Sequence, residues 1–241
     1  MYQPTLQHRL AAEGVGSALL AAAVVGSGIM GERLSGGNVA IALLANAVAT
    51  GAALIALTLA FQPVSGAHFN PVVSLSCAWR GSIAWRDVPG YVGLQFLGTA
   101  AGVVAAHGMF GEPWVSLSTH ERSGIAQLWS EFIATFGLLS VIWGCSGARA
   151  PFAVAAYITG AYWFTASTSF ANPAITVARC LSNTFAGIRP ADVPGFVVAQ
   201  LVGAAVATAF FCWLQPASIH PRPEPDASPI ESKELLEKDI R

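Results

Sequence analysis

Six long apolar stretches constrain the fold of this chain more than any other feature of its sequence. Each is long enough to cross a membrane, because a helix needs about 17–25 residues to span about 30 Å of hydrocarbon. In lipid such stretches must be helical, because only a helix satisfies its own backbone polar groups. We therefore predict an all-α membrane protein with six transmembrane helices, near Ala11–Met30, Val39–Phe61, Val88–Ala106, Ile125–Cys145, Pro151–Thr168 and Val193–Leu214.

The distribution of charge supports this interpretation and excludes a soluble fold. Only 25 of the 241 residues are Lys, Arg, Asp or Glu, which is 10%; a soluble domain has about 25%. Ten of these charges lie in residues 215–241, so that only 15 remain in the first 214 residues. The net charge of −1 and the lack of a basic patch also exclude a nucleic-acid-binding protein.

The reactive residue types show no catalytic or metal-binding pattern. The four cysteines lack the spacing of a zinc site or a redox motif, and we interpret them as small core residues. No nucleophile–base set and no phosphate-binding loop occurs along the chain. We therefore expect no enzyme activity, no metal and no cofactor. The cysteines are Cys77, Cys145, Cys180 and Cys212.

An even number of spans places both termini on the same side of the membrane. The count of Lys and Arg favours the cytoplasmic side only when the C-terminal tail is included. We divide the chain into a cytoplasmic N-terminus at 1–10, a membrane domain at 11–214 and a cytoplasmic tail at 215–241. The tail holds five prolines and mixed charges, and we predict that it is mostly disordered.

The membrane domain contains two copies of one pattern, at about 11–106 and 125–214. Three spans per copy is an odd number, so the second copy must enter the membrane upside down. The matching landmarks are Glu13 and Glu131 near the start of each copy, Val88-Pro89-Gly90 and Val193-Pro194-Gly195, then Gln95 and Gln200, and finally Gly98 and Gly203.

Each copy also contains an Asn-Pro pair followed by a short apolar segment. The segments Asn70–Trp79 and Asn172–Leu181 are too short to span a membrane and too apolar for ordinary loops. Asn is a favoured N-cap and Pro is favoured at the first helical position, so each pair predicts the start of a helix. Two re-entrant half-helices from opposite faces would bring their positive ends together near the midplane.

At these motifs the chain resembles the aquaporin family, the major intrinsic proteins. The resemblance covers about residues 10–214 and rests on Ser65–Pro71, on Asn172-Pro173-Ala174 and on the two glutamates. It implies six tilted helices, two half-helices and one pore per subunit, usually in a homotetramer in the cell membrane. The pore would pass small neutral solutes, and the half-helix dipoles would exclude protons. It also implies that Glu13 and Glu131 are structural acids that bind the re-entrant loops.

Two departures from the family pattern concern the pore. The first motif is Asn70-Pro71-Val72, where the family usually has Ala in the third position. After the second motif the family normally has an Arg that lines the narrow filter, and here the residue is Ile175. The family spacing places the other filter positions at Thr50, Gly160 and Ser169. This set has no ring, no His and no Arg, so we expect a wide filter with little electrostatic selection.

Arg179 lies four residues after Ile175, on the same face of the predicted half-helix and one turn further out. We expect it either to line the outer vestibule or to extend to the membrane interface. The segment from Asn172 to Arg179 is similar to that of bacterial members associated with arsenic resistance. That similarity adds neutral arsenous acid and methylated arsenicals to water and glycerol-like polyols as candidate solutes.

An ion-coupled secondary transporter is the alternative, since such proteins also use inverted repeats and broken helices. It would need charged or polar coupling residues at the midplane, where this sequence places only the two asparagines. In that case Glu13 and Glu131 would carry protons. His68, just before the first motif, could gate the pore by protonation or could simply be a satisfied loop residue.

Overall fold

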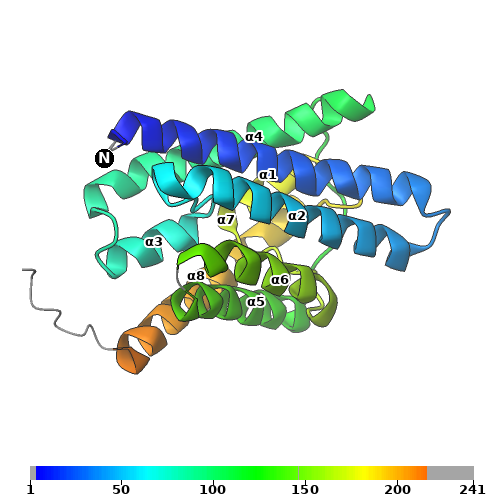
Figure 1. Cartoon of the computed structure of the whole chain (residues 1–241). Helices are drawn as coiled ribbons and strands as arrows, with labels where there is room; N and C mark the ends of the chain where they lie inside the picture. Colours follow the sequence, from blue (N-terminus) through cyan, green and yellow to red (C-terminus); the bar gives the residue numbers. More distant parts are fainter. Residues whose placement is uncertain (1–3, 146, 216–241) are drawn as a thin grey trace, which may run out of the picture.

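Eight α-helices and three 3-10 helices make up the regular structure of the described part of the chain, residues 4–145 and 147–215 of a computed structural model (Figure 1). No strand occurs within these residues. The predicted disordered tail lies almost wholly outside them. The α-helices are α1 (Leu6–Leu34), α2 (Val39–Ser65), α3 (Pro71–Trp79), α4 (Val88–Phe110), α5 (Ile125–Gly144), α6 (Ala150–Phe164), α7 (Pro173–Arg179) and α8 (Val193–Leu214); the 3-10 helices are η1 (Trp85–Asp87), η2 (Gly147–Arg149) and η3 (Pro190–Asp192).

The six predicted spans correspond to α1, α2, α4, α5, α6 and α8, and the two predicted half-helices correspond to α3 and α7. Five of the six long helices are long and apolar enough to cross a membrane. The exception is α6, which has 15 residues, or about 22 Å at the rise of an α-helix. It ends before the predicted Thr168 because the chain becomes extended at Thr165 and then turns towards the second Asn-Pro pair.

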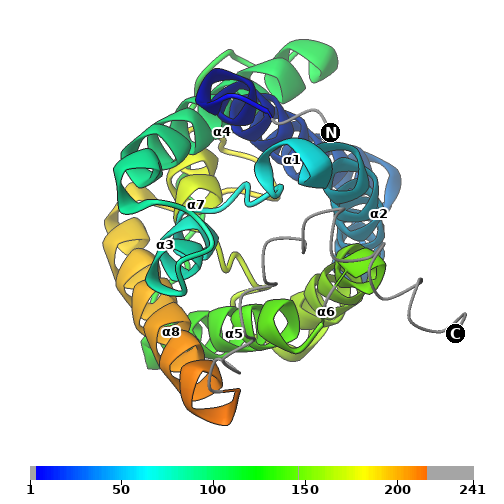
Figure 2. The ribbon, with the colours of Figure 1, turned by 60° about the vertical axis from the view of Figure 1, so that its left-hand side comes forward.

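The six long helices surround the two half-helices (Figure 2). In the first copy α1 packs against α2 and α4, and in the second copy α5 packs against α6 and α8. Each half-helix contacts both copies. The half-helices α3 and α7 each pack against both α4 and α8, and they also touch one another. This exchange is the arrangement expected of an inverted repeat.

Small residues allow the first and last helices of each copy to approach closely. A Cβ atom at Gly98 would collide with the backbone carbonyl of Gly14, and one at Gly203 would lie 2.6 Å from the carbonyl of Phe132. Both glycines occupy the same place in their copies, three residues after a buried glutamine. Close backbone contact of this kind drives helix association in membranes, where the hydrophobic effect is absent.

The outer surface of the helix ring is apolar. Large side chains such as Ile41, Val48 and Val202 are exposed on it. Six tryptophans are also exposed, and Trp is enriched where a protein meets the membrane interfaces. These observations, together with the five apolar helices, describe an integral multi-pass membrane protein.

The cysteines do not all behave as small core residues. All four are free thiols, but only Cys77 is buried, and Cys212 is exposed on α8. Position on a helix face decides this, since Cys212 points away from the neighbouring helices. The described residues contain no group of three side chains that could hold a metal ion.

Candidate functional site

The two Asn-Pro pairs start the half-helices in the same way. Asn70 is the N-cap of α3, and its Oδ1 accepts a hydrogen bond of 3.1 Å from the N–H of Val72. Asn172 is the N-cap of α7, and its Oδ1 accepts one of 3.0 Å from the N–H of Ala174. Proline occupies the first turn in both, where its missing N–H has no cost. Each amide therefore uses its oxygen locally and keeps its NH₂ group for other contacts.

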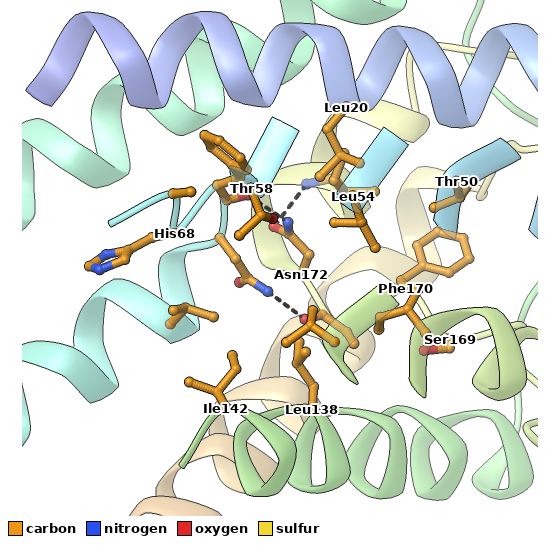
Figure 3. A pocket seen from close by; sticks show the side chains of 18 of the residues that line it. Leu20, Thr50, Leu54, Thr58, His68, Leu138, Ile142, Ser169, Phe170 and Asn172 are labelled. Atoms are coloured by element: carbon orange, nitrogen blue, oxygen red, sulfur yellow. Dashed lines mark hydrogen bonds between the residues drawn. The ribbon is translucent and has the colours of Figure 1, made fainter. Parts of the chain in front are cut away.

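The amide groups of the two asparagines link the copies to one another (Figure 3). Nδ2 of Asn70 donates to the carbonyl of Ala171, and Nδ2 of Asn172 donates to the carbonyl of Phe69, both over 2.8 Å. Phe69 and Ala171 adopt left-handed φ angles of 49° and 48°, an unusual conformation for residues other than glycine. An amide nitrogen has two protons, so one N–H of each Asn remains for a passing solute.

Glu13 holds the loop before the first motif. One of its oxygens accepts from the N–H of His68 over 2.9 Å, and the other accepts from the N–H of Phe69 over 2.7 Å. Ser65 and Gln95 donate to the same carboxylate through their side chains. The group is fully buried, and it satisfies backbone donors that would otherwise be left unpaired.

Glu131 holds the loop before the second motif in a matching way. Its two oxygens accept from the N–H groups of Phe170 and Ala171, each over 2.9 Å. Gln200 donates to it over 2.6 Å, as Gln95 does in the first copy. The two glutamates and two glutamines that the repeat predicted to be equivalent thus form equivalent networks.

A cavity of about 190 Å³ runs past the two asparagines. Figure 3 shows His68 at one end and Thr50, Ser169 and Phe170 at the other, with Asn172 between them. We call these the His68 end and the Arg179 end. No Asp or Glu within the described residues lines the cavity. Its polar or ionisable lining residues are Thr50, Thr58, Gln62, His68, Asn70, Cys77, Tyr162, Ser169, Asn172 and Arg179.

Three of the four predicted filter residues line this cavity, namely Thr50, Ser169 and Ile175. The hydroxyl of Ser169 is buried and has no hydrogen-bond partner in the described part of the chain. Ile175 is buried beside Leu20 and Val24 of α1.

The expectation for Gly160 was wrong. Gly160 is exposed on the face of α6 away from the cavity, and its neighbours Ile158 and Tyr162 line the cavity instead. The reason is helical periodicity, because residues four apart share a face while a residue two positions away points elsewhere. Tyr162 reaches Thr50, with 3.3 Å between the two hydroxyl oxygens.

Three residues outside the predicted filter set also line the cavity, namely Tyr162, Phe170 and Arg179. The prediction for Arg179 included this position, whereas the two rings were not predicted. Sequence reasoning missed the two rings. The spacing of Ile158 and Tyr162 along an apolar helix could have indicated a shared face, whereas no local signal distinguished Phe170 from a core residue.

Arg179 is buried, with 3% of its surface exposed. Its Nε donates to the carbonyl of Ala186, and its guanidinium carbon lies 3.4 Å from the centre of the Phe170 ring. Two positions were predicted for the Arg179 side chain, one beside the cavity and one extended to the membrane interface. This geometry matches the first. The charge therefore lies one helical turn beyond Ile175, at the Arg179 end.

Comparisons with known proteins identify the family of this chain. The family described as Major intrinsic protein matches residues 1–152. The chain is 51% identical over 223 residues to the aquaglyceroporin AqpS of Rhizobium meliloti (strain 1021), which covers 90% of this chain and 94% of that protein. It is 31% identical over 140 residues to the aquaporin NIP6-1 of Arabidopsis thaliana, covering 57% of this chain and 45% of that protein.

A solved structure supports the fold independently. The aquaglyceroporin from Plasmodium falciparum matches with a TM-score of 0.67 at 19% identity, over 90% of this chain and 98% of that one. At this level of identity the match shows the fold alone. The family match and the bacterial relative go further, and they exclude an enzyme. This chain therefore belongs to the major intrinsic protein family, the aquaporin family of membrane channels.

Proposed function

We propose that the protein is a passive channel for small uncharged solutes, with water and glycerol-like polyols as the main class. The observation that carries this proposal is the cavity past Asn70 and Asn172, which no carboxylate lines within the described residues. Such a path offers hydrogen-bond donors and acceptors to neutral molecules, and the described residues that line it include no carboxylate to neutralise a cation. The bacterial relative of 51% identity is named an aquaglyceroporin, which supports the same class.

The selectivity filter of this proposal lies at the Arg179 end. Thr50, Tyr162 and Ser169 supply hydroxyl groups to a polyhydroxylated solute, and Ile175 supplies an apolar wall where the family normally has Arg. We propose that Ile175 widens the filter beyond what water needs. Neutral metalloid acids such as arsenous acid, and methylated arsenicals, present similar hydroxyl groups and belong to the same candidate class.

Arg179 contributes positive charge above this filter. Its guanidinium reinforces the positive ends of α3 and α7 against cations and protons. The outer-vestibule role expected from the sequence thus becomes part of the proposal, with Phe170 as the surface that holds the group in place.

A proton-coupled transporter is less well supported by the geometry. Its candidate proton carriers would be Glu13 and Glu131, and both carboxylates accept backbone hydrogen bonds that fix the re-entrant loops. Protonation would remove acceptors that these buried N–H groups need. We propose a structural role for both glutamates.

The cellular arrangement follows the family pattern. We propose a homotetramer in the cell membrane, with both termini in the cytoplasm and the channel domain at residues 11–214. The two repeats, at about 11–106 and 125–214, then contribute one half-helix each to every pore.

Osmotic swelling of proteoliposomes tests the function. We expect rapid fluxes of water and glycerol, and a measurable flux of arsenous acid at neutral pH. Replacing the apolar wall by Ile175→Arg should reduce glycerol flux at least tenfold and reduce water flux less. Water flux without any glycerol flux would contradict the wide filter. Accumulation of solute driven by a proton or sodium gradient would contradict a channel.

A further inference from the structure

Arg122 is a buried cation that the sequence did not single out. It lies in the loop between α4 and α5, with 9% of its surface exposed. Its Nε donates to the carbonyl of Gly187 over 2.8 Å, and its Nη1 donates to the carbonyl of Ser167 over 3.3 Å. Arg122 thus joins the segment that precedes α7 to the loop that follows it.

The same loop also holds Arg179. The carbonyl of Ala186 accepts from Arg179, while the carbonyls on either side of it, those of Phe185 and Gly187, accept from Arg122. Three successive carbonyls therefore bind two guanidinium groups. A movement of this loop would displace both.

Phe170 makes a second connection between the two arginines. The guanidinium carbon of Arg179 lies 3.4 Å from the centre of its ring, and that of Arg122 lies 5.0 Å from it. The ring edge packs against Phe196, with 5.2 Å between the ring centres. Cations over an aromatic face are attracted to it, so the ring helps to keep both guanidinium groups in position.

This arrangement places two positive charges on the same loop and the same ring, and the carboxylate of Glu131 acts on both of them without contacting either. Within the described residues neither Arg122 nor Arg179 forms a salt bridge; the bridges involve Arg9, Arg33, Arg86 and Arg189. Like charges repel, and the repulsion is stronger where water is scarce. The carbonyls and the ring therefore hold the guanidinium of Arg179 beside a second positive charge.

We propose that Arg122 is a positioning residue for selectivity. It fixes Phe170 and residues 185–187, and through them it holds Arg179 against the cavity. This inference rests on the proposed function and extends it, because it assigns the cation barrier at the Arg179 end to three residues instead of one. Loss of Arg122 would release Arg179 and allow cations and protons to pass, while the asparagine pair and the water path remain.

Two substitutions separate positioning from charge. Arg122→Met removes the charge and the hydrogen bonds, whereas Arg122→Lys keeps the charge but cannot reproduce the planar set of donors. If positioning is the role, both variants should raise the proton leak of proteoliposomes at least fivefold, with water permeability per folded protein changed less than twofold. A Lys variant with the wild-type leak would overturn positioning, because charge alone would then suffice.

A double variant tests whether Arg122 acts through Arg179. Arg179→Met should raise the leak by itself, and Arg122→Met combined with it should add no further increase, since interacting residues are non-additive. Independent, multiplying effects would overturn the inference. Arg33→Gln is the matched control, because Arg33 is a half-exposed cation at the end of α1 that pairs with Glu112 and contacts neither the loop nor the ring; its leak should equal that of the wild type.

A further variant covers the case in which Arg122→Met does not fold, and the leak assay separates this inference from the proposed function. If Arg122→Met does not fold, Phe170→Leu removes the ring while leaving the hydrogen bonds of Arg122 in place, and it should raise the leak selectively. An unchanged leak in that variant, or a fall of water permeability and leak in equal proportion, would overturn the inference. The leak assay needs no solute, so a wild-type protein without glycerol flux would refute only the proposed function.

Discussion

The two ends of the cavity occupy equivalent places in the two repeats but carry different chemistry. Cys77 lies seven residues after Asn70, and Arg179 lies seven residues after Asn172; both line the cavity. His68 and Phe170 are equivalent in the same way, two residues before each asparagine. Around the midplane, by contrast, the Asn, Pro, Glu and Gln residues of the two copies match in type and in hydrogen bonding. The scaffold is therefore duplicated, whereas the one arginine that lines the cavity within the described residues belongs to the second copy.

This difference shows which parts of the repeat are constrained by backbone chemistry. The N–H groups before each half-helix must find buried acceptors in either copy, which requires a carboxylate at positions 13 and 131. The residues that face the cavity have no such obligation. They are free to differ, and in the proposed channel this difference places the selectivity filter at one end.

The largest expected effect comes from breaking the duplicated scaffold. Glu13→Ala and Glu131→Ala each leave two backbone N–H groups without their acceptor and remove one of the two acceptors of a glutamine amide. Each unpaired group costs about 1–3 kcal/mol, so we expect most of the folded protein to be lost. The yield of monodisperse protein in detergent and its Tm measure this, with the exposed Glu121→Ala as control. A Glu13 variant with the wild-type Tm would show that the copies are not equivalent.

A smaller effect is expected where the helices approach closely. Gly98→Ala forces a methyl group against the carbonyl of Gly14 and should destabilise the protein by about 1–3 kcal/mol. Gly93 lies on the same helix with nothing within 4 Å of its added Cβ. Gly93→Ala should therefore leave the Tm unchanged or raise it slightly. Equal Tm values for the two variants would contradict close packing as the role of Gly98.

The difference between the ends can be reduced by giving one end the residue of the other. Arg179→Cys places at the second half-helix the residue that the first half-helix carries at position 77. We expect the proton leak to rise about tenfold, a barrier change of about 1.4 kcal/mol, with water permeability within twofold of the wild type. Stopped-flow swelling and a pH-sensitive dye in the same vesicles measure both. An unchanged leak would mean that the half-helix dipoles suffice.

The smallest effect concerns pH. Burial lowers the pKa of His120, in the loop before α5, and the nearby charges of Arg122 and Arg179 lower it further, against a smaller opposing effect of Glu32. A lowered histidine pKa means that the unfolded chain binds the proton more readily, so stability falls as pH decreases through about 6.5. Between pH 7 and pH 5 we expect Tm to fall by roughly one to three degrees.

His120→Gln should reduce this pH dependence, and so should Arg179→Cys, because the latter removes one of the charges that act on His120. Thermal unfolding at pH 5, 6 and 7 measures the slope. A slope that Arg179→Cys leaves unchanged would indicate that the charge of Arg179 does not contribute to the lowered pKa of His120.

Much of the architecture could be predicted from the sequence because it depends on local and periodic features. The lengths of the apolar stretches predicted the spans, and the Asn-Pro pairs predicted the starts of α3 and α7. The internal repeat predicted that Glu13 and Glu131 are equivalent. Each of these follows from backbone hydrogen bonding in lipid, which acts on every chain alike.

The lining of the cavity could only be decided by the tertiary structure. Gly160 was counted into the filter, yet the rotation of α6 turns it outwards and brings in Tyr162. Arg122 lies 57 positions before Arg179 along the chain, and only the folded loops bring both to the ring of Phe170. The sequence by itself determined the duplicated scaffold, because its hydrogen bonds are obligatory. Tertiary packing decided which side chains line the cavity, because a helix has several faces and the contacts with neighbouring helices determine which face is turned inwards.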